Sequence, residues 1–141
     1  NQIILGGNHI MSRIGDFLKE TSVFFIATND GAQPKLRPFG AFAEIDGKVI
    51  FVVGDHKAVY RQLAANPLCE IVACKPEGLW LRYTGKAVFT DEPRYAEAML
   101  AANPFLKDIY NENTPFSMKI FYLEDATAGI INVMGEPENI L

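Results

Sequence analysis

The chain has 141 residues, which fits a single domain and leaves little room for a second one. Hydrophobic residues make up 49% of the sequence, enough for a packed core that does not depend on disulfides. The net charge of −4 and the lack of a basic stripe argue against nucleic acid as the main partner, because its phosphates would meet few cations.

The first half of the chain reads as two helices and three strands. Apolar residues on one face predict the first helix, and Asp46-Gly47 between alternating apolar runs predicts a tight hairpin. We interpret residues 1–9 as a lead-in and residues 10–137 as one domain. The predicted elements are a helix over His9–Glu20, strands over Val23–Thr28, Pro34–Ile45 and Lys48–Val53, and a helix over Lys57–Asn66.

The second half adds more hairpin-linked strands. Pro93, preceded by acidic residues, favours a helix start, and Glu124-Asp125 is interpreted as a hairpin turn. The predicted elements are strands over Leu68–Cys74 and Leu79–Thr90, a helix from Pro93 to Asn103, a short helical piece over Phe105–Tyr110, a hairpin of Ser117–Leu123 with Ala126–Val133, and an irregular tail over Gly135–Leu141. This order predicts an α+β fold in which an antiparallel sheet closes, or nearly closes, into a barrel.

The two cysteines, Cys69 and Cys74, lie five residues apart in one predicted strand. An odd separation places them on opposite faces, so they cannot bridge each other without a bulge. We interpret both as small core residues in a reducing compartment and expect a cytoplasmic protein. No apolar run approaches the ~20 residues that cross a bilayer, and no signal-peptide pattern is visible, so we expect no membrane association.

The junction between the strand Lys48–Val53 and the following helix carries the sequence Gly54-Asp55-His56-Lys57. Amide groups at a helix start lack partners, and the helix dipole favours an anion there. Lys57 adds a positive charge beside the glycine. The junction therefore suits a phosphate group, although a helix-start lysine that points to solvent is an equally good interpretation.

A second cluster lies on the neighbouring strand, at Arg37, Pro38 and Phe39. Pro38 interrupts the strand ladder and leaves backbone groups free for a flat heterocycle, and an arginine can serve the polar edge of that ring. Trp80 and Arg82 share one face of a later strand, which indicates a surface toward a ligand or a partner, unless Trp80 is ordinary core. Together these residues predict a phosphorylated aromatic ligand lying along a β-surface.

Motifs for phosphate-binding loops, serine hydrolases and zinc peptidases are not found in the sequence. His9 and His56 are the only histidines, and neither has a Cys or carboxylate at metal-ligand spacing, so we expect no metal site. An enzyme with so little acid–base machinery would take its chemistry from a cofactor.

Three segments stand out together. They are Leu36-Arg37-Pro38-Phe39-Gly40, then Lys57-x-Val59-Tyr60-x-Gln62-Leu63-x-x-Asn66-Pro67, then Trp80-Leu81-Arg82-x-x-Gly85-Lys86-Ala87. In this order they resemble the pyridoxamine 5′-phosphate oxidase-like family, and more narrowly its short FMN-binding split-barrel proteins grouped with nitroimidazole-resistance reductases. The resemblance extends from Ile10 to Pro137.

The resemblance implies a six-stranded antiparallel split β-barrel, with helices at the connections, that forms a homodimer with FMN at the dimer interface. The residues that it implies at FMN are Arg37, Pro38 and Phe39 beside the ring, Gly54, Asp55, His56 and Lys57 at the phosphate, and Trp80 and Arg82 approaching from the other subunit.

The implied activity is the reduction of a small flat electrophile, such as a nitroaromatic or a quinone, by reduced flavin. The alternatives are a flavin-binding stress or sensor module without robust turnover, and a deazaflavin or haem binder on the same fold. Oxidation of pyridoxamine phosphate itself is not expected, because residues 132–141 lack the Trp and Arg that the longer oxidases use to bind the vitamin.

Overall fold

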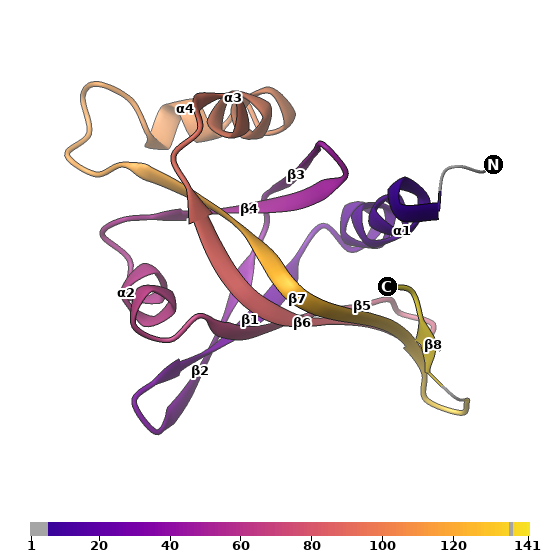
Figure 1. The fold of residues 1–141 in the computed structure, drawn as a ribbon. Helices are drawn as coiled ribbons and strands as arrows, with labels where there is room; N and C mark the ends of the chain where they lie inside the picture. Colours follow the sequence, from indigo (N-terminus) through magenta and orange to yellow (C-terminus); the bar gives the residue numbers. More distant parts are fainter. Residues whose placement is uncertain (1–5, 136) are drawn as a thin grey trace.

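The computed structural model describes residues 6–135 and 137–141 of the chain, and the side chains from Arg13 onward. Four helices and eight strands form this part of the chain, and most helices connect groups of strands (Figure 1). The helices are α1 Gly6–Thr21, α2 Ala58–Ala65, α3 Pro93–Ala102 and α4 Leu106–Ile109. The strands are β1 Phe24–Asp30, β2 Gln33–Phe39, β3 Phe42–Ile45, β4 Lys48–Gly54, β5 Leu68–Cys74, β6 Leu79–Thr90, β7 Met118–Asn132 and β8 Glu138–Asn139.

All of the strands belong to one sheet, in the order β2-β1-β5-β6-β7-β4-β3, with β8 added beside β7. Every pairing in it is antiparallel. The predicted α+β class with an antiparallel sheet is therefore confirmed. The described residues form eight strands, whereas the sequence pattern predicts seven and the family resemblance implies six.

The two end strands of the sheet, β2 and β3, are neighbours in sequence. Only Gly40 and Ala41 connect them. The short connection between them keeps the two edges of the sheet close together, so the sheet is curled. The predicted single strand over Pro34–Ile45 is therefore wrong: the chain leaves its partner β1 at Phe39 and pairs again, from Phe42, with β4. Within the described residues, no ladder joins β2 to β3 or β4, so the barrel stays open at this point.

Strand β7 runs unbroken from Met118 to Asn132, so the predicted hairpin at Glu124-Asp125 is also wrong. Both halves of β7 pair with β6, and the register shifts opposite Gly85. Asp125 has a φ of 50°, which aspartate tolerates in a turn or in a bulge. The pattern read as a turn is thus a β-bulge, and it bends a single long strand.

The C-terminal tail contains a short strand, although it was predicted to be irregular. Strand β8 pairs with Gly129 and Ile130 of β7. Arg13 of α1 donates two hydrogen bonds, of 3.0 and 2.9 Å, to the carboxylate of Glu138. Ile140 is buried in the core, so the end of the chain packs against the barrel.

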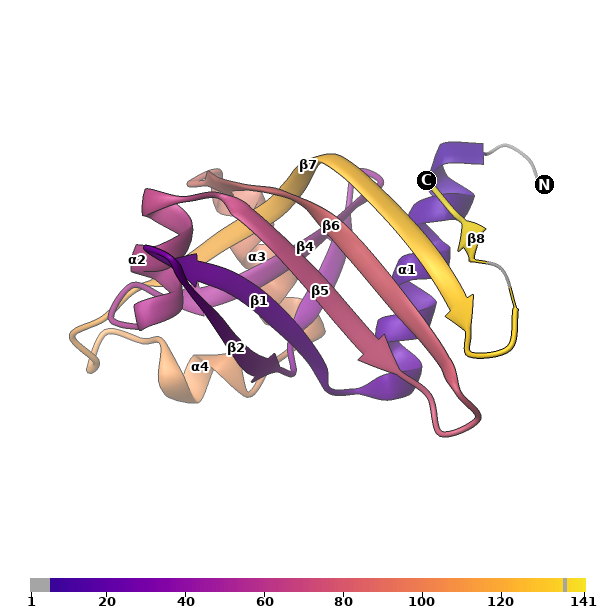
Figure 2. The same ribbon diagram turned by 90° about the horizontal axis from the view of Figure 1, so that it is seen from below.

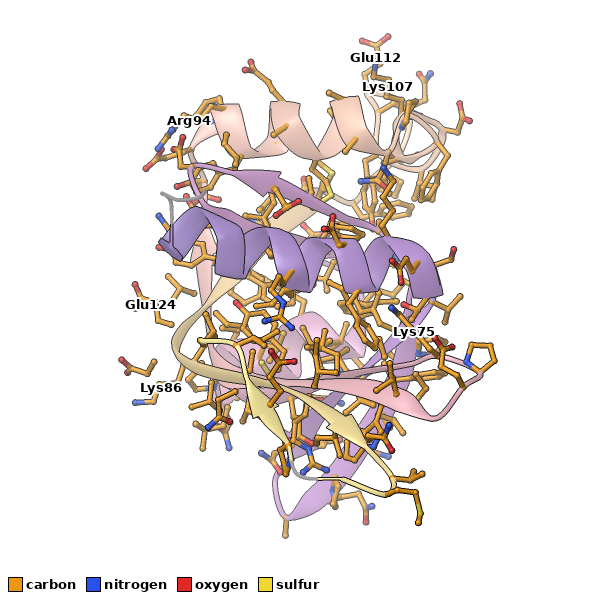
Figure 3. All side chains as sticks on the ribbon, turned by 90° about the vertical axis from the view of Figure 1, so that its right-hand side faces the viewer. Lys75, Lys86, Arg94, Lys107, Glu112 and Glu124 are labelled. Carbon is orange, nitrogen blue, oxygen red and sulfur yellow. The ribbon has the colours of Figure 1, made fainter. Side chains whose placement is uncertain are left out.

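The core has two parts on opposite sides of the β4–β7 wall. Inside the barrel, aromatic and aliphatic side chains such as Phe24, Phe51 and Phe121 are fully buried, and Leu18 of α1 packs with them. A second cluster, which contains Met99, joins α3 and α4 to β3, β4 and β7. The helices lie behind the sheet face of β1, β5 and β6 or at its ends (Figure 2). Charged side chains such as Lys86, Arg94 and Glu124 lie on the outside of the molecule (Figure 3).

The cysteines lie on opposite faces of β5, as the spacing predicts. Cys69 is buried, and burial raises the pKa of its thiol to about 12. Cys74 is exposed, so its prediction as a core residue is wrong. Cys74 lies on the outward face of β5, where no other part of the described structure covers its side chain.

Candidate functional site

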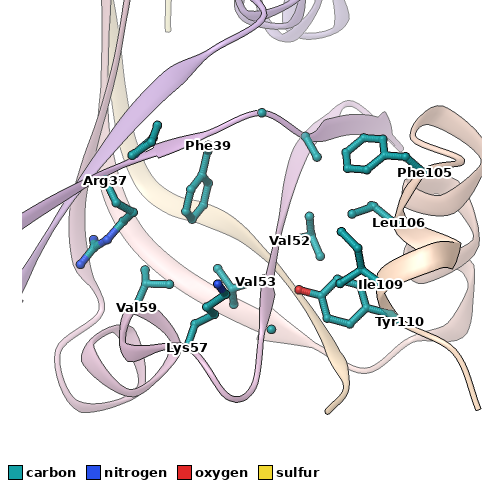
Figure 4. A pocket seen from close by; sticks show the side chains of 14 residues that line it. Arg37, Phe39, Val52, Val53, Lys57, Val59, Phe105, Leu106, Ile109 and Tyr110 are labelled. Atoms are coloured by element: carbon teal, nitrogen blue, oxygen red, sulfur yellow. The ribbon is translucent and has the colours of Figure 1, made fainter. Parts of the chain in front are cut away.

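A pocket of about 390 Å³ lies at the opening between β2 and β4, with α4 on its far side (Figure 4). Three parts of the chain form its walls: the end of β2 with the β2–β3 connection, the end of β4 with the start of α2, and the α4 segment. The lining residues are Arg37, Pro38, Phe39, Gly40, Ala41, Val52, Val53, Gly54, Lys57, Val59, Phe105, Leu106, Ile109 and Tyr110.

The β2 wall contains three of the predicted site residues, Arg37, Pro38 and Phe39. This wall is accessible because β2 is an end strand that pairs only with β1 in the described structure. Pro38 is exposed and has no N–H to offer a further strand, which keeps this edge unpaired. The wall is therefore an open, partly apolar strand edge.

The guanidinium of Arg37 is held by three acceptors. It donates to the backbone oxygen of Ile26 at 3.2 Å, to Oγ1 of Thr28 at 2.7 Å and to Oε1 of Gln62 at 2.6 Å. Thr28 also donates to the same Gln62 oxygen at 2.6 Å, and both of these polar side chains are buried. Burial lowers the pKa of Arg37, but an arginine stays charged. Gln62 of α2 thus helps to hold the Arg37 guanidinium, and its positive charge, in one position at the edge of the pocket.

The sequence reading did not single out Thr28 or Gln62 as polar partners. The sequence indicates Gln62 only through the family resemblance. The available signal was a glutamine on the inward face of a short helix, because Val59 and Leu63 on either side of it are buried. A buried glutamine needs partners, and here they come from two other strands.

Lys57 and Gly54 bring the β4–α2 junction into the pocket. Lys57 is the N-cap residue of α2, and α2 has no side-chain cap hydrogen bond. Gly54 lies in a tight space: a Cβ atom there would come within 2.5 Å of the His56 ring and 2.8 Å of the Tyr110 hydroxyl. The junction thus offers a positive charge beside uncapped helix amides, where an anion is favoured.

Asp55 and His56 are not among the residues that line the pocket. The backbone N–H of Asp55 donates to the Ser117 oxygen, and its carboxylate accepts from the Ser117 N–H, both at 2.9 Å. The His56 ring stacks on Phe116, with centroids 4.0 Å apart. Both residues connect the junction to the segment before β7. Their contacts with Phe116 and Ser117 lie outside the pocket and support the junction.

The α4 wall was missed by the sequence reading. Phe105, Leu106 and Ile109 present apolar side chains to the pocket, and Tyr110 adds a hydroxyl (Figure 4). Burial, and secondarily the charge of Asp55, raise the pKa of Tyr110. The short apolar helix was predicted, but nothing in its own sequence indicates that it packs opposite β2.

Trp80 and Arg82 lie on the outward face of β6, away from this pocket. The Arg82 guanidinium lies 4.6 Å from the centre of the Trp80 ring and pairs with Glu70 at 3.2 Å. Arg82 and Val72 are register partners, and Val72 in turn pairs with Phe25. These residues therefore form part of the sheet face that no described helix covers (Figure 2).

No cluster of three or more His, Cys, Asp or Glu side chains that could hold a metal ion occurs among the described residues. None of the described helices is long and apolar enough to cross a membrane.

An antiparallel barrel that is open between two end strands, with a pocket at the opening, defines a split-barrel protein. The family model described as pyridoxamine 5′-phosphate oxidase matches residues 10–123. The chain belongs to this pyridoxamine 5′-phosphate oxidase-like split-barrel family, as the resemblance indicated.

Solved structures agree with this assignment. A NimC/NimA family protein from Clostridium acetobutylicum is 35% identical with a TM-score of 0.86, over 95% of this chain and 93% of that chain. General stress protein 26 from Bacillus anthracis is 13% identical with a TM-score of 0.71, over 93% and 98%. A heme binding protein from Mycobacterium smegmatis is 16% identical with a TM-score of 0.70, over 98% and 59%. The last two structures are too different in sequence to indicate more than a shared fold. None of the curated proteins compared with the chain matches it.

Proposed function

We propose that the protein is an FMN-binding oxidoreductase that reduces a small flat electrophile, such as a nitroaromatic or a quinone. The observation that supports this most directly is the composition of the pocket. Lys57 and the uncapped start of α2 lie at one end, and a partly apolar wall of β2 and α4 forms the rest. A ligand with one anionic group and one flat apolar body fits this combination.

The residues present suit FMN in two respects. Lys57 and the first amides of α2 would hold the phosphate, because charge and helix dipole both favour an anion there. Arg37, Pro38 and Phe39 would lie beside the ring, with the fixed guanidinium at its polar edge. Trp80 and Arg82 would reach the flavin only from a second copy of the chain, since they lie outside the pocket of their own.

Bound flavin would supply hydride transfer, and the chain would supply position and electrostatics. The Gln62–Thr28 pair holds Arg37 in one orientation, so its charge does not need to reorganise. The open barrel edge beside Pro38 leaves the ring accessible to a second flat molecule. No step requires a protein nucleophile.

The deciding experiment is the absorbance spectrum of the freshly purified protein, with the extracted cofactor identified by mass. FMN is expected, whereas a deazaflavin or haem would replace this proposal. Stoichiometric oxidation of NADPH in the presence of a nitroaromatic or quinone is then expected. Tight FMN with no reduction by any nicotinamide would instead support a flavin-binding module without turnover.

We also propose that two copies associate through the uncovered face of β1, β2, β5 and β6. Phe25 is 40% exposed and Leu36 is 68% exposed on this face. Large exposed apolar side chains on one sheet face are typical of interaction sites. The free cysteines accord with a reducing compartment, and we propose the cytoplasm.

A further inference from the structure

The hydroxyl of Tyr110 reaches the β4–α2 junction from the opposite side of the pocket. A Cβ atom at Gly54 would lie only 2.8 Å from this oxygen, so the hydroxyl lies against the Gly54 backbone. Figure 4 shows the Tyr110 hydroxyl and the Lys57 side chain directed into the same pocket. The junction proposed for the phosphate thus has a neutral donor on one side and a cation on the other.

Tyr110 is held in this position by its neighbours. Its backbone N–H donates to Leu106 at 2.8 Å and ends α4. Its ring meets Phe116 edge to face at 5.8 Å, and Phe116 stacks on His56. The ring is therefore packed on the side away from the cavity, and the hydroxyl is the part that faces it.

This hydroxyl has no hydrogen-bond partner among the described residues, although the side chain is half buried. Buried tyrosine hydroxyls normally find a partner, and a ligand that displaces water from this pocket would supply one for Tyr110. The raised pKa of Tyr110 keeps its proton in place at neutral pH, so it serves as a donor. By contrast, the Arg37 guanidinium already donates to three protein oxygens.

We propose that Tyr110 is a specificity-determining residue that donates a hydrogen bond to the terminal phosphate of the bound flavin nucleotide. A phosphate has three acceptor oxygens, more than a single ammonium can serve. Lys57 and the α2 amides serve one side, and Tyr110 serves the other. The residue then selects phosphorylated flavin over riboflavin. This inference rests on the proposed function.

The test is calorimetric titration of apoprotein with FMN and with riboflavin, for wild type and Tyr110→Phe. The substitution keeps the ring and its packing on Phe116 and removes only the donor. FMN affinity should fall roughly 10- to 100-fold, the size of one hydrogen bond to a charged group, while riboflavin affinity is unchanged. Tyr122→Phe is the matched control, since Tyr122 packs on Tyr95 of α3 and does not line the pocket, and both affinities should stay at wild-type values.

Unchanged FMN affinity in Tyr110→Phe would show that Tyr110 is only part of the apolar wall. An equal loss for FMN and riboflavin would show a contact with the ring or the sugar chain, and either outcome overturns the inference. Failure of the proposed function has a different signature, because wild-type protein would then bind neither flavin. A thermal midpoint equal to that of wild type confirms that the variant is folded.

Discussion

Arg37 carries a charge that the protein has fixed before any ligand arrives. Its three acceptors come from β1 and α2, so the guanidinium cannot follow a ligand and instead imposes a constant field on the pocket edge. Such preorganised charge acts on whatever negative charge develops nearby. Its effect should therefore appear in the energetics of reduction more than in affinity.

Arg37→Ala should make bound flavin harder to reduce. Removing a cation from the polar edge of the ring lowers the midpoint potential, by tens of millivolts if ~1–2 kcal/mol is lost, since about 30 mV corresponds to 1.4 kcal/mol for a two-electron couple. Potentiometric titration measures this shift. Lys35→Ala removes an exposed charge from the same strand and should leave the potential unchanged. If the Arg37 variant loses only affinity, the ring does not lie along β2.

Lys57→Ala should weaken FMN binding roughly 10- to 100-fold, the loss expected for one charge-assisted hydrogen bond. Fluorescence titration of the apoprotein gives the affinity. Lys57 is exposed, so the free energy of unfolding should not change. Lys107→Ala is the charge-matched control, because Lys107 belongs to α4 but is not among the residues that line the pocket, and it lies at the outer edge of the molecule (Figure 3). Equal losses in both variants would reveal a general charge effect in place of a phosphate contact.

Among the elements, the β7 bulge has a steric requirement that is set by a backbone atom. A Cβ atom at Gly85 would come within 2.9 Å of the Glu124 backbone oxygen, and a backbone atom cannot move aside easily. Gly85→Ala should therefore lower the free energy of unfolding by about 1–3 kcal/mol, measured by urea denaturation.

Gly129→Ala, farther along β7, is the comparison for this prediction. The nearest atom to a Cβ there is 3.5 Å away, an ordinary contact, so its cost should be well below that of Gly85→Ala. Equal costs for the two variants would mean that the bulge is not the sensitive feature.

The sequence predicts most elements because their signals are local. Asp46 and Gly47 both have positive φ, which confirms the tight turn that the dipeptide predicts. The same reasoning fails at Glu124-Asp125, because an aspartate in the left-handed region fits a turn and a bulge equally well, and only the pairing with β6 decides between them.

The candidate site was partly predictable for the same physical reason. Lys57 and Arg37 belong to short segments with their own chemistry, and the structure brings both to one pocket. The α4 wall and Tyr110 could not be placed, because a four-residue helix carries no information about which strand it faces. That placement depends on the packing of α3 and α4 against β3 and β4.

At the scale of the whole molecule, we expect a homodimer of twice 15.7 kDa in solution. Light scattering with flavin bound should give this mass at micromolar concentration. Leu36→Glu places a charge on the uncovered face and should shift the protein toward monomer, because an unpaired charge is costly to bury. Val133→Glu, at another exposed apolar position, should not change the mass. A monomeric wild type would contradict the proposed interface.

Stability should fall as the pH rises above about 9. Burial raises the pKa of Cys69 from 9.0, and that of Tyr83 from 10.0, to about 12. At a pH between a group's unfolded pKa and its folded pKa, the unfolded chain loses a proton that the folded chain keeps. Each of the two groups therefore lowers the free energy of unfolding by up to about 1.4 kcal/mol per pH unit in that range. Urea denaturation across this range measures the slope, and Cys69→Ala should reduce it between pH 9 and 10.

The opening between β2 and β3 also has a kinetic consequence. In the part of the chain that the structure describes, Gly40-Ala41 connects β2 to β3 and no ladder crosses the gap, so bending at these two residues widens the pocket without breaking any strand pairing. A ligand can then enter and leave by local breathing of the β1–β2 hairpin, and its exchange rate need not follow the global unfolding rate. In hydrogen exchange, the outer edge of β2 should accordingly exchange far faster than β5 or β6, which are paired on both sides.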